Sequence, residues 1–263
     1  PIPSRGLGDV YKRQSLRFMI KLIRELKKDL KMSIKYISFD LDDTFWDVMP
    51  TIYRAEDKTK EWIKDNFPGV TKVMDTDTVI DLRNKILKED PSLLVKISEL
   101  RTRIFYETAV MAGYSEVESH EMSQKAFQIF INARNDVKLF DGVRETLESL
   151  SNKYSLGVIT NGNADLKKIG IDHFFKHIFS SANSGAHKPD PRAFEALINA
   201  SNLQANEICH VGDHPLNDVK GSLECGMKPI WYKNDGAEWP YDDIDVPSFE
   251  KWQDFESVLE QSY

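Results

Sequence analysis

The stretch that decides the fold is KYISFDLDDTFWDV, residues 35–48, in which an apolar run ends in a group of carboxylates. The run is β-branched and aromatic, which is typical of a buried strand. Asp40 and Asp42 follow it directly. Because alternate residues of an extended chain point to the same side, we expect these two carboxylates to face one spot. Their repulsion calls for a compensating positive charge.

Residues 48–135 contain no second run of this kind and are predicted to be helical. Their apolar residues recur at helical spacing, and breaks fall at Pro68–Gly69, Asp90–Pro91 and Gly113. The predicted helices cover residues 51–67, 77–90, 93–113 and 115–134.

From Val137 onward, strands alternate with helices, which predicts a parallel sheet covered on both faces. The predicted strands cover residues 154–160, 177–182, 207–213 and 228–233, and the predicted helices cover 142–153, 191–201 and 217–226. The predicted fold class is α/β. A Rossmann-like parallel sheet core, residues 34–47 and 136–263, carries an inserted all-helical cap domain, residues 48–135.

The N-terminal residues differ in character from the rest of the chain. Residues 1–14, PIPSRGLGDVYKRQ, have no apolar periodicity, and DVYKRQ is similar to the translation of an adapter used in sequencing libraries. We expect this segment to be non-native and exclude it from the fold. Residues 15–33 are expected to be an extension or leader, with the true start at Met19 or Met32. A basic amphipathic helix that touches a membrane is the alternative.

The composition excludes several classes of function. A net charge of −7 over 263 residues does not favour binding to nucleic acid. The two cysteines, Cys209 and Cys225, form no C-x-x-C pair, so neither a disulfide framework nor a zinc site is predicted, and a cytoplasmic location is expected. No apolar run approaches the roughly 18 residues that a membrane span needs.

Polar residues gather where ligands bind an open parallel sheet, beyond the carboxyl ends of the strands. Three strand ends and one helix start supply carboxylates, a hydroxyl, an amide and an ammonium: Asp40, Asp42, Thr160, Asn161, Lys188, Asp213 and Asp218. Oxygen ligands without His or Cys suit Mg²⁺, which often shares a phosphate in its coordination sphere. Thr160 and Lys188 could bind phosphate oxygens. The site is therefore predicted to carry out metal-assisted phosphoryl transfer.

Four motifs in order, DLDDT, ITNG, HKPDP and GDHPLND, resemble those of the haloacid dehalogenase-like superfamily. The resemblance covers the chain from about Ile34 to the C-terminus. It implies that Asp40 is the nucleophile that forms an aspartyl-phosphate, and that Asp42 is the general acid and base. It also implies that Lys188 offsets negative charge on the nucleophile and on the phosphate.

The resemblance also assigns the remaining site residues. Thr160 and Asn161 match the phosphate-binding turn. Asp40, Asp213 and the backbone carbonyl of Asp42 are expected to hold Mg²⁺, with Asp218 in the inner coordination shell or just outside it. His214 stands where relatives often have Asp or Asn, and both a contact with substrate and a neutral place in the loop are open for it.

Asp42 favours a phosphatase, with a phosphomutase as the alternative, because the resemblance implies that dehalogenases of this fold lack a carboxylate at this position. The helical insertion resembles a cap that closes over small molecules. Stretches around the motifs are similar to bacterial phosphatases acting on flavin mononucleotide (FMN) and on 5-amino-6-(5-phospho-D-ribitylamino)uracil, a riboflavin precursor. The alternatives are a phosphatase for a sugar phosphate, phosphoglycolate or a nucleoside monophosphate, and, more distantly, a non-catalytic protein that binds phosphometabolites. The expected partner is a small-molecule phosphate ester, and the expected state is a monomer or homodimer.

Phe45 and Trp46 lie where the chain passes from the catalytic pair into the helical domain. One alternative is that both rings pack at the hinge. The other is that one ring faces the cleft and contacts a flat leaving group, such as an isoalloxazine or a pyrimidine. Both residues are therefore candidate substrate contacts.

Overall fold

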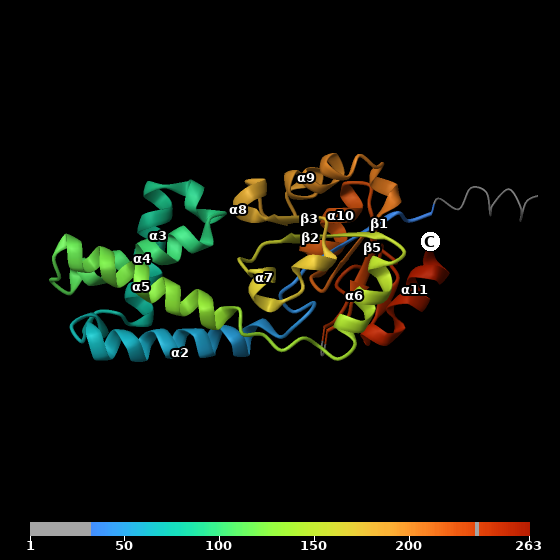
Figure 1. The fold of residues 1–263 in the computed structure, drawn as a ribbon. Coiled ribbons are helices and arrows are strands. Elements are labelled where there is room, and N and C mark those ends of the chain that lie inside the picture. Colours follow the sequence, from blue (N-terminus) through green and yellow to red (C-terminus); the bar gives the residue numbers. More distant parts are fainter. Residues whose placement is uncertain (1–32, 235–236) are drawn as a thin grey trace, which may run out of the picture.

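The structure is a computed structural model that describes residues 33–234 and 237–263. The predictions for residues 1–32, which concern the adapter-derived segment and the two candidate start residues, lie outside the described residues. Figure 1 shows two groups of elements next to each other: a sheet flanked by helices, and a separate group of helices, α2 to α5.

A six-stranded parallel sheet forms the centre of the first group, in the strand order β3-β2-β1-β4-β5-β6. The strands are β1 (Tyr36–Phe39), β2 (Ser155–Thr160), β3 (His177–Ser180), β4 (Ile208–Gly212), β5 (Lys228–Tyr232) and β6 (Ser248–Phe249). Because β1 lies between β2 and β4, the residues that follow these three strands meet at one edge of the sheet. The predicted fold class, a parallel α/β core with an inserted helical domain, is confirmed.

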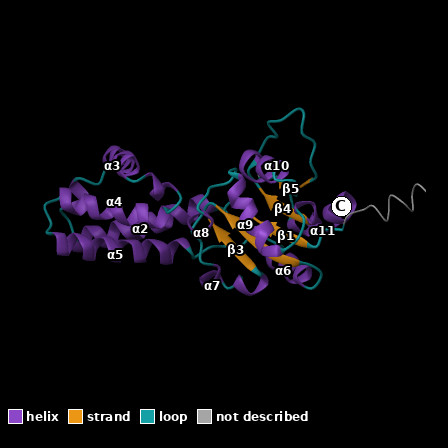
Figure 2. Ribbon diagram, turned by 90° about the horizontal axis from the view of Figure 1, so that it is seen from above, coloured by secondary structure: helices purple, strands orange, loops and turns teal. Residues whose placement is uncertain are grey.

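Helices cover both faces of the sheet (Figure 2). The long ones are α6 (Val143–Ser151), α9 (Pro191–Ser201) and α11 (Phe255–Ser262). Side chains alternate along β1, so that Ile37 and Phe39 pack in one cluster with α6 and α11, whereas Tyr36 packs in another with α9. Burial on both faces explains why the strands are apolar throughout.

Two predictions of local structure need correction, and one short strand was missed. The strand expected over residues 177–182 ends at Ser180, because the Ser180 N–H donates to Asn183 Oδ1 and starts the short helix α8 (Ser181–Ser184). The helix expected over residues 217–226 is instead a π-helical turn, Pro215–Lys220, followed by α10 (Gly221–Glu224). The two-residue strand β6 was not predicted. The remaining short helix is α7 (Leu166–Ile169).

The second group consists of α2 (Val48–Asn66), α3 (Thr76–Glu89), α4 (Ile97–Met111) and α5 (Glu116–Arg134). Capping residues define where these helices start: Asp47 accepts the Met49 N–H at α2, and Ser115 forms a capping box with Glu118 at α5. All three predicted breaks fall between helices. In the described part of the chain, no helix combines the length and the apolar character that crossing a membrane requires.

Candidate active site

The carboxyl ends of β1 and β4 bring three predicted metal ligands together. The Asp40 N–H donates to the Val211 carbonyl of β4 at 2.8 Å, which continues the strand pairing into the site. Asp40, Asp213 and Asp218 each place a carboxylate oxygen within 4.8 Å of the others. The convergence of these carboxylates at one edge of the sheet agrees with the expectation from the sequence.

Lys188 connects two of these carboxylates. Its Nζ donates to Asp40 Oδ1 and to Asp218 Oδ1, both at 2.6 Å, and its side chain is 2% exposed. Asn161 fixes the Lys188 backbone: Asn161 Oδ1 accepts the Lys188 N–H at 2.8 Å, and Asn161 Nδ2 donates to the Lys188 carbonyl at 3.1 Å. Since the Asn161 side chain is committed to Lys188, the phosphate contact predicted for Asn161 would have to come from its main chain.

Negative charge exceeds positive charge in this cluster, where three carboxylates face one ammonium. Burial raises the pKa of Asp40 to about 7, although the charge of Lys188 opposes it. Burial, reinforced by the charges of Asp218 and Asp40, raises the pKa of Asp213 to about 8. Burial also disfavours the charge of Asp218, but Lys188 and a hydrogen bond from His210 hold its pKa well below the usual range. A divalent cation would balance these charges, and an all-carboxylate donor set suits Mg²⁺.

Two residues that the sequence did not single out hold Asp213 and Asp218 in place. Thr44 Oγ1 donates to Asp213 Oδ1 at 3.0 Å. Gly212 allows Asp218 to approach the strand, because a Cβ added at Gly212 would lie 2.3 Å from Asp218 Cγ. The positions of both residues inside the DLDDT and GDHPLND motifs could have identified them.

His210 supports Asp218 from within the sheet. It pairs in register with Ser38 of β1, whose Oγ lies 2.8 Å from His210 Nδ1, and His210 Nε2 lies 3.3 Å from Asp218 Oδ1. Burial lowers the pKa of His210, which favours a neutral ring. A ring that accepts from Ser38 at Nδ1 carries its proton on Nε2 and donates it to Asp218. Only the strand register reveals this partnership.

His214 starts the π-helical turn. Its Nδ1 accepts the N–H groups of Leu216 and Asn217, both at 3.2 Å, and its own N–H donates to Asp218 Oδ2 at 3.0 Å. The imidazole thus has the capping role that Asp or Asn commonly plays at a helix start. The place in the loop, and not a substrate contact, accounts for this side chain.

Asp42 and Thr160 lie on either side of Gly162. A Cβ added at Gly162 would lie 2.5 Å from Asp42 Oδ2 and 3.3 Å from Thr160 Oγ1. Thr160 is buried, and its Oγ1 accepts the Gly162 N–H at 3.0 Å. The predicted general acid and the predicted phosphate-binding hydroxyl therefore lie close together at the end of β2.

Asp42 is bound by two donors. Trp46 Nε1 donates to Asp42 Oδ1 at 2.9 Å, and Arg134 Nη2 lies 2.6 Å from both carboxylate oxygens. Arg134 is the last residue of α5 and is 1% exposed. The sequence carried no signal for Arg134, because 92 positions separate it from Asp42 and the helical pattern alone explains its place.

Phe45 and Trp46 are both fully buried, and neither lines the cavity described below. Phe45 packs against Phe39 and Trp252 in the α/β core, with ring centroids 5.3 Å apart in both pairs. Trp46 points its N–H at Asp42. This placement supports hinge packing, the first of the two alternatives, because neither ring is offered to a leaving group.

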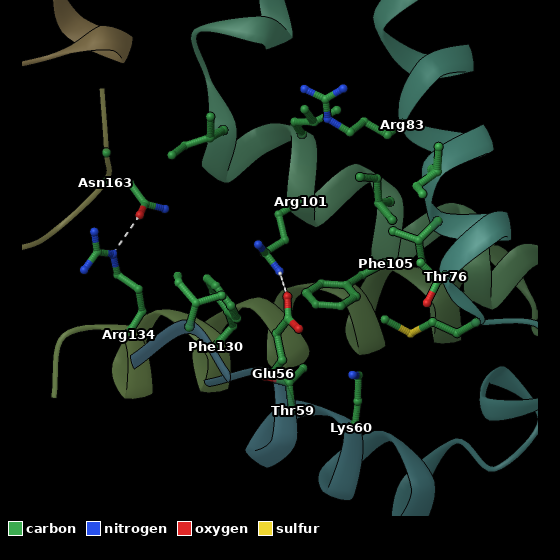
Figure 3. A pocket seen from close by; sticks show the side chains of 18 of the residues that line it. Glu56, Thr59, Lys60, Thr76, Arg83, Arg101, Phe105, Phe130, Arg134 and Asn163 are labelled. Carbon is green, nitrogen blue, oxygen red and sulfur yellow. Dashed lines mark hydrogen bonds and ion pairs between the residues drawn. The ribbon is translucent and has the colours of Figure 1, made fainter. Parts of the chain in front are cut away.

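A cavity of about 550 Å³ is lined by residues of helices α2 to α5 and by Asp42. Figure 3 shows the side chains that the helices contribute. The wall of the cavity is largely apolar and includes Ile52, Met74, Ile97, Leu100, Phe105 and Phe130. In its middle, Arg101 lies 3.6 Å from Glu56 and 3.8 Å from the centre of the Phe130 ring. Lys60 and Arg83 also line it, and neither forms an ion pair with another described residue. Its size is that of a small-molecule site.

Contacts between the two groups of elements surround this cavity. Asn163 Nδ2 donates to Ser98 Oγ of α4 at 3.0 Å, and Ser181 Oγ donates to the Val95 carbonyl at 3.0 Å. The His187 ring, which lines the cavity, is 3.0 Å from the Leu94 carbonyl. The segment before α4 therefore covers the edge of the sheet at which the site lies.

Replacement of Lys188 by methionine tests the cluster as a stability element. Removing one partner of a buried ion pair leaves uncompensated buried charge, and we expect Lys188→Met to lower the free energy of unfolding by about 3–5 kcal/mol. The matched control is Lys233→Met, whose exposed pair with Glu250 is worth less than about 1 kcal/mol. Urea unfolding of both variants measures the difference. Equal losses would show that Lys188 does not hold the carboxylates together.

Comparison with known proteins agrees with this site. A family model described as haloacid dehalogenase-like hydrolase matches residues 70–232. The 5-amino-6-(5-phospho-D-ribitylamino)uracil phosphatase YigB of Escherichia coli is 27% identical over 205 residues, 78% of this chain and 86% of that protein. A glyceraldehyde 3-phosphate phosphatase of Pyrococcus furiosus is 29% identical over 76% of this chain and 81% of its own length.

A crystal structure titled 2-haloacid dehalogenase from Pseudomonas syringae pv. Tomato is 34% identical, with a TM-score of 0.84, over 87% of this chain and 99% of that chain. The curated relatives named above are phosphatases, and the prediction of an enzyme of the phosphatase kind is confirmed. Together with the fold and the four motifs, these matches show that the chain belongs to the haloacid dehalogenase-like hydrolase family.

Proposed function

We propose that this protein is a Mg²⁺-dependent phosphatase that hydrolyses small phosphate monoesters through an aspartyl-phosphate, with FMN or 5-amino-6-(5-phospho-D-ribitylamino)uracil as its substrate. The observation that carries the proposal is the placement of Asp42 between two features. Its charge acts on Asp40 of the Lys188-bridged carboxylate cluster, and its side chain lines a cavity large enough for a metabolite. Nucleophile, acid and leaving-group space are thus contiguous.

In the first step, an oxygen of Asp40 attacks phosphorus while the bond to the leaving oxygen breaks. Asp42 gives its proton to that oxygen, which departs as an alcohol. Lys188, already bound to Asp40, offsets charge on the nucleophile and on the phosphate. The Thr160 hydroxyl and the main-chain N–H groups after β2 bind phosphate oxygens.

In the second step, Asp42 takes a proton from water, and the resulting hydroxide attacks the phosphorus of the aspartyl-phosphate and frees Asp40. When bound by Asp40, Asp213, Asp218 and the backbone carbonyl of Asp42, Mg²⁺ would supply positive charge that stabilises the charged phosphoryl group. We propose that residues 48–135 act as a cap that excludes water from the leaving-group side during the first step.

The cavity supports a flat leaving group. Its apolar wall suits a ring system, and Lys60 and Arg83 on different helices suit carbonyl or anionic groups at the ring edge (Figure 3). Both FMN and the riboflavin precursor combine a flat heterocycle with such acceptors. The similarity to YigB, whose name gives the riboflavin precursor as substrate, supports the same class.

Two other functions are weighed against this one. The glyceraldehyde 3-phosphate phosphatase relative favours a sugar phosphate, which would leave the apolar part of the cavity without a partner. The structural neighbour from Pseudomonas syringae, which is named as a 2-haloacid dehalogenase, favours halide displacement. A halide needs no proton to leave, whereas a carboxyl group on the leaving-group side, where Asp42 lines the cavity, is what a phosphatase requires.

A phosphate-release screen with Mg²⁺ tests the proposal. The panel contains FMN, 5-amino-6-(5-phospho-D-ribitylamino)uracil, glyceraldehyde 3-phosphate, phosphoglycolate and a nucleoside monophosphate, compared by kcat/KM. We expect the two flat-ring esters to be preferred. A preference for glyceraldehyde 3-phosphate or phosphoglycolate would show that the proposed substrate is wrong. A lack of phosphate release from every ester would refute the proposed phosphatase activity.

Replacement of Trp46 by phenylalanine decides between the two alternatives for this residue. The change removes the Nε1 donor to Asp42 but keeps an aromatic ring. We expect kcat/KM for FMN and for glycerol 3-phosphate to fall by the same factor, about fivefold, the size of one lost hydrogen bond of about 1 kcal/mol. A fall in kcat/KM confined to FMN would instead support the other alternative, in which the Trp46 ring contacts the leaving group.

Two further expectations stay predictions. Cys209 and Cys225 are both free thiols, as a reducing compartment allows, and the cytoplasmic location is proposed on that ground. We also propose that the protein is a monomer or a homodimer.

A further inference from the structure

Arg134 joins the end of α5 to Asp42 and has one nitrogen left over. Its Nη2 binds both oxygens of Asp42, and its Nε donates to Asn163 Oδ1 at 3.1 Å. Its Nη1 is buried and has no hydrogen-bond partner among the residues that the structure describes. A buried N–H of a charged group is costly without an acceptor, so an oxygen that arrives at Nη1 would gain a strong hydrogen bond.

The surroundings of this guanidinium are those of the reacting ester. Asp42, Arg134 and Gly162 all line the cavity. A Cβ added at Gly162 would lie 3.3 Å from Arg134 Nη2 and 3.3 Å from Thr160 Oγ1, so Nη2, which is bonded to the same carbon as Nη1, lies beside the turn that is predicted to bind phosphate. An ester bound at this turn brings its oxygens next to Arg134.

The contacts of Arg134 do more than stabilise the fold. A buried ion pair contributes little net stability compared with apolar packing, so stability alone does not explain an arginine here. Because Nε binds Asn163 while Nη2 binds both oxygens of Asp42, the planar guanidinium joins these two side chains at a fixed spacing, which the single nitrogen of a lysine could not do. Asn163, the other partner of Arg134, binds Ser98 of α4, so the position of Asp42 is linked to the docking of the helices.

We propose that Arg134 is a positioning residue that holds Asp42 against the leaving oxygen, and that its free Nη1 donates to an oxygen of the bound phosphate ester. The proposal rests on the proposed phosphatase function and adds a residue from the helical group to the reaction. It also gives a reason why Gly162 has no side chain, since a methyl group there would displace Asp42.

Two esters that differ in their need for an acid test the positioning role: phenyl phosphate, whose phenolate is a poor leaving group, and 4-nitrophenyl phosphate, whose phenolate is a good one. The value of kcat/KM covers the steps up to leaving-group departure. Acid catalysis contributes about 10²–10⁴-fold, so we expect Arg134→Gln to lower kcat/KM for phenyl phosphate at least about tenfold more than for 4-nitrophenyl phosphate. Arg134→Lys is expected to change this ratio in the same direction.

Inorganic phosphate tests the contact of Nη1. It is the product and a competitive inhibitor of the proposed reaction. We expect its inhibition constant to rise by about tenfold or more in Arg134→Gln, the size of one lost hydrogen bond to a charged group. Arg103→Gln is the matched control, because Arg103 is another arginine of the helical group that pairs with Glu107 at 2.6 Å and does not line the cavity. It is expected to keep the wild-type ratio between the two esters.

A double-mutant cycle tests whether Arg134 acts through Asp42. In an Asp42→Asn background there is no acid left to position, so Arg134→Gln is expected to leave the ratio between the esters unchanged. If Arg134→Gln unfolds in a thermal melt, Arg134→Lys, which keeps the charge, provides the same measurement.

Two results would overturn the proposal. An equal loss of kcat/KM for both esters in folded variants rules out positioning of the acid, and an unchanged inhibition constant for phosphate rules out the Nη1 contact. A wild-type protein that releases phosphate from neither ester would refute the proposed function instead, so the two failures are distinct.

Discussion

Replacement of Asp40 by asparagine is expected to abolish phosphate release, with kcat reduced by about four powers of ten or more, as when a nucleophile is removed from other enzymes. An amide is a poor nucleophile and a weaker metal ligand than a carboxylate. The side chain is nearly the same size, and Lys188 keeps its second partner, Asp218, at 2.6 Å. The fold should therefore survive, and a thermal melt close to that of the wild type is expected.

The control for this experiment is Asp47→Asn. Asp47 lies seven positions further on and caps α2 by accepting the Met49 N–H, a role that asparagine fills equally well. We expect it to keep wild-type activity and stability. Asp42→Asn provides a graded comparison, because its loss should be smaller for 4-nitrophenyl phosphate than for an alkyl phosphate. Near-wild-type turnover by pure Asp40→Asn protein would show that the reaction does not pass through an aspartyl-phosphate at Asp40.

The sequence predicted, for a physical reason, which residues meet at the edge of the sheet. Asp40, Thr160 and Asp213 each end an apolar run, and parallel strands place such ends side by side whatever the rest of the chain does. The helical insertion followed from the same logic, since capping and breaking residues such as Asp47 and Gly113 act locally. Each of these features is written within a few residues of where it acts.

The features that the sequence did not reveal depend on distant parts of the chain. Arg134 contacts Asp42 only because α5 ends beside the sheet, and His210 supports Asp218 only because β4 pairs in register with β1. Trp46 shows the same limit. Its aromatic ring suggested a contact with substrate, whereas in the structure its N–H donates to Asp42. Periodicity cannot report contacts of this kind.

The second large effect concerns the metal. The pKa values of Asp40 and Asp213, raised to about 7 and about 8 mainly by burial, mean that the protein groups alone do not fully stabilise the charged carboxylates. A bound divalent cation would favour the charged forms, and an ionised Asp40 is what the reaction requires. The same cation should stabilise the folded protein, by about 2.7 kcal/mol at a concentration 100 times its Kd.

We therefore expect exhaustive chelation to reduce phosphate release to background and addition of Mg²⁺ to restore it, together with a rise in Tm. Ca²⁺ should inhibit, because its larger and more flexible coordination shell misplaces Asp40 relative to phosphorus. Asp213→Asn should need more Mg²⁺ for half-maximal activity and should show a smaller rise in Tm, whereas Asp47→Asn should behave as the wild type. Full activity after chelation would contradict the metal-assisted mechanism. A rise in Tm without any gain in activity would mean that the carboxylates bind the cation but that the cation does not take part in the reaction.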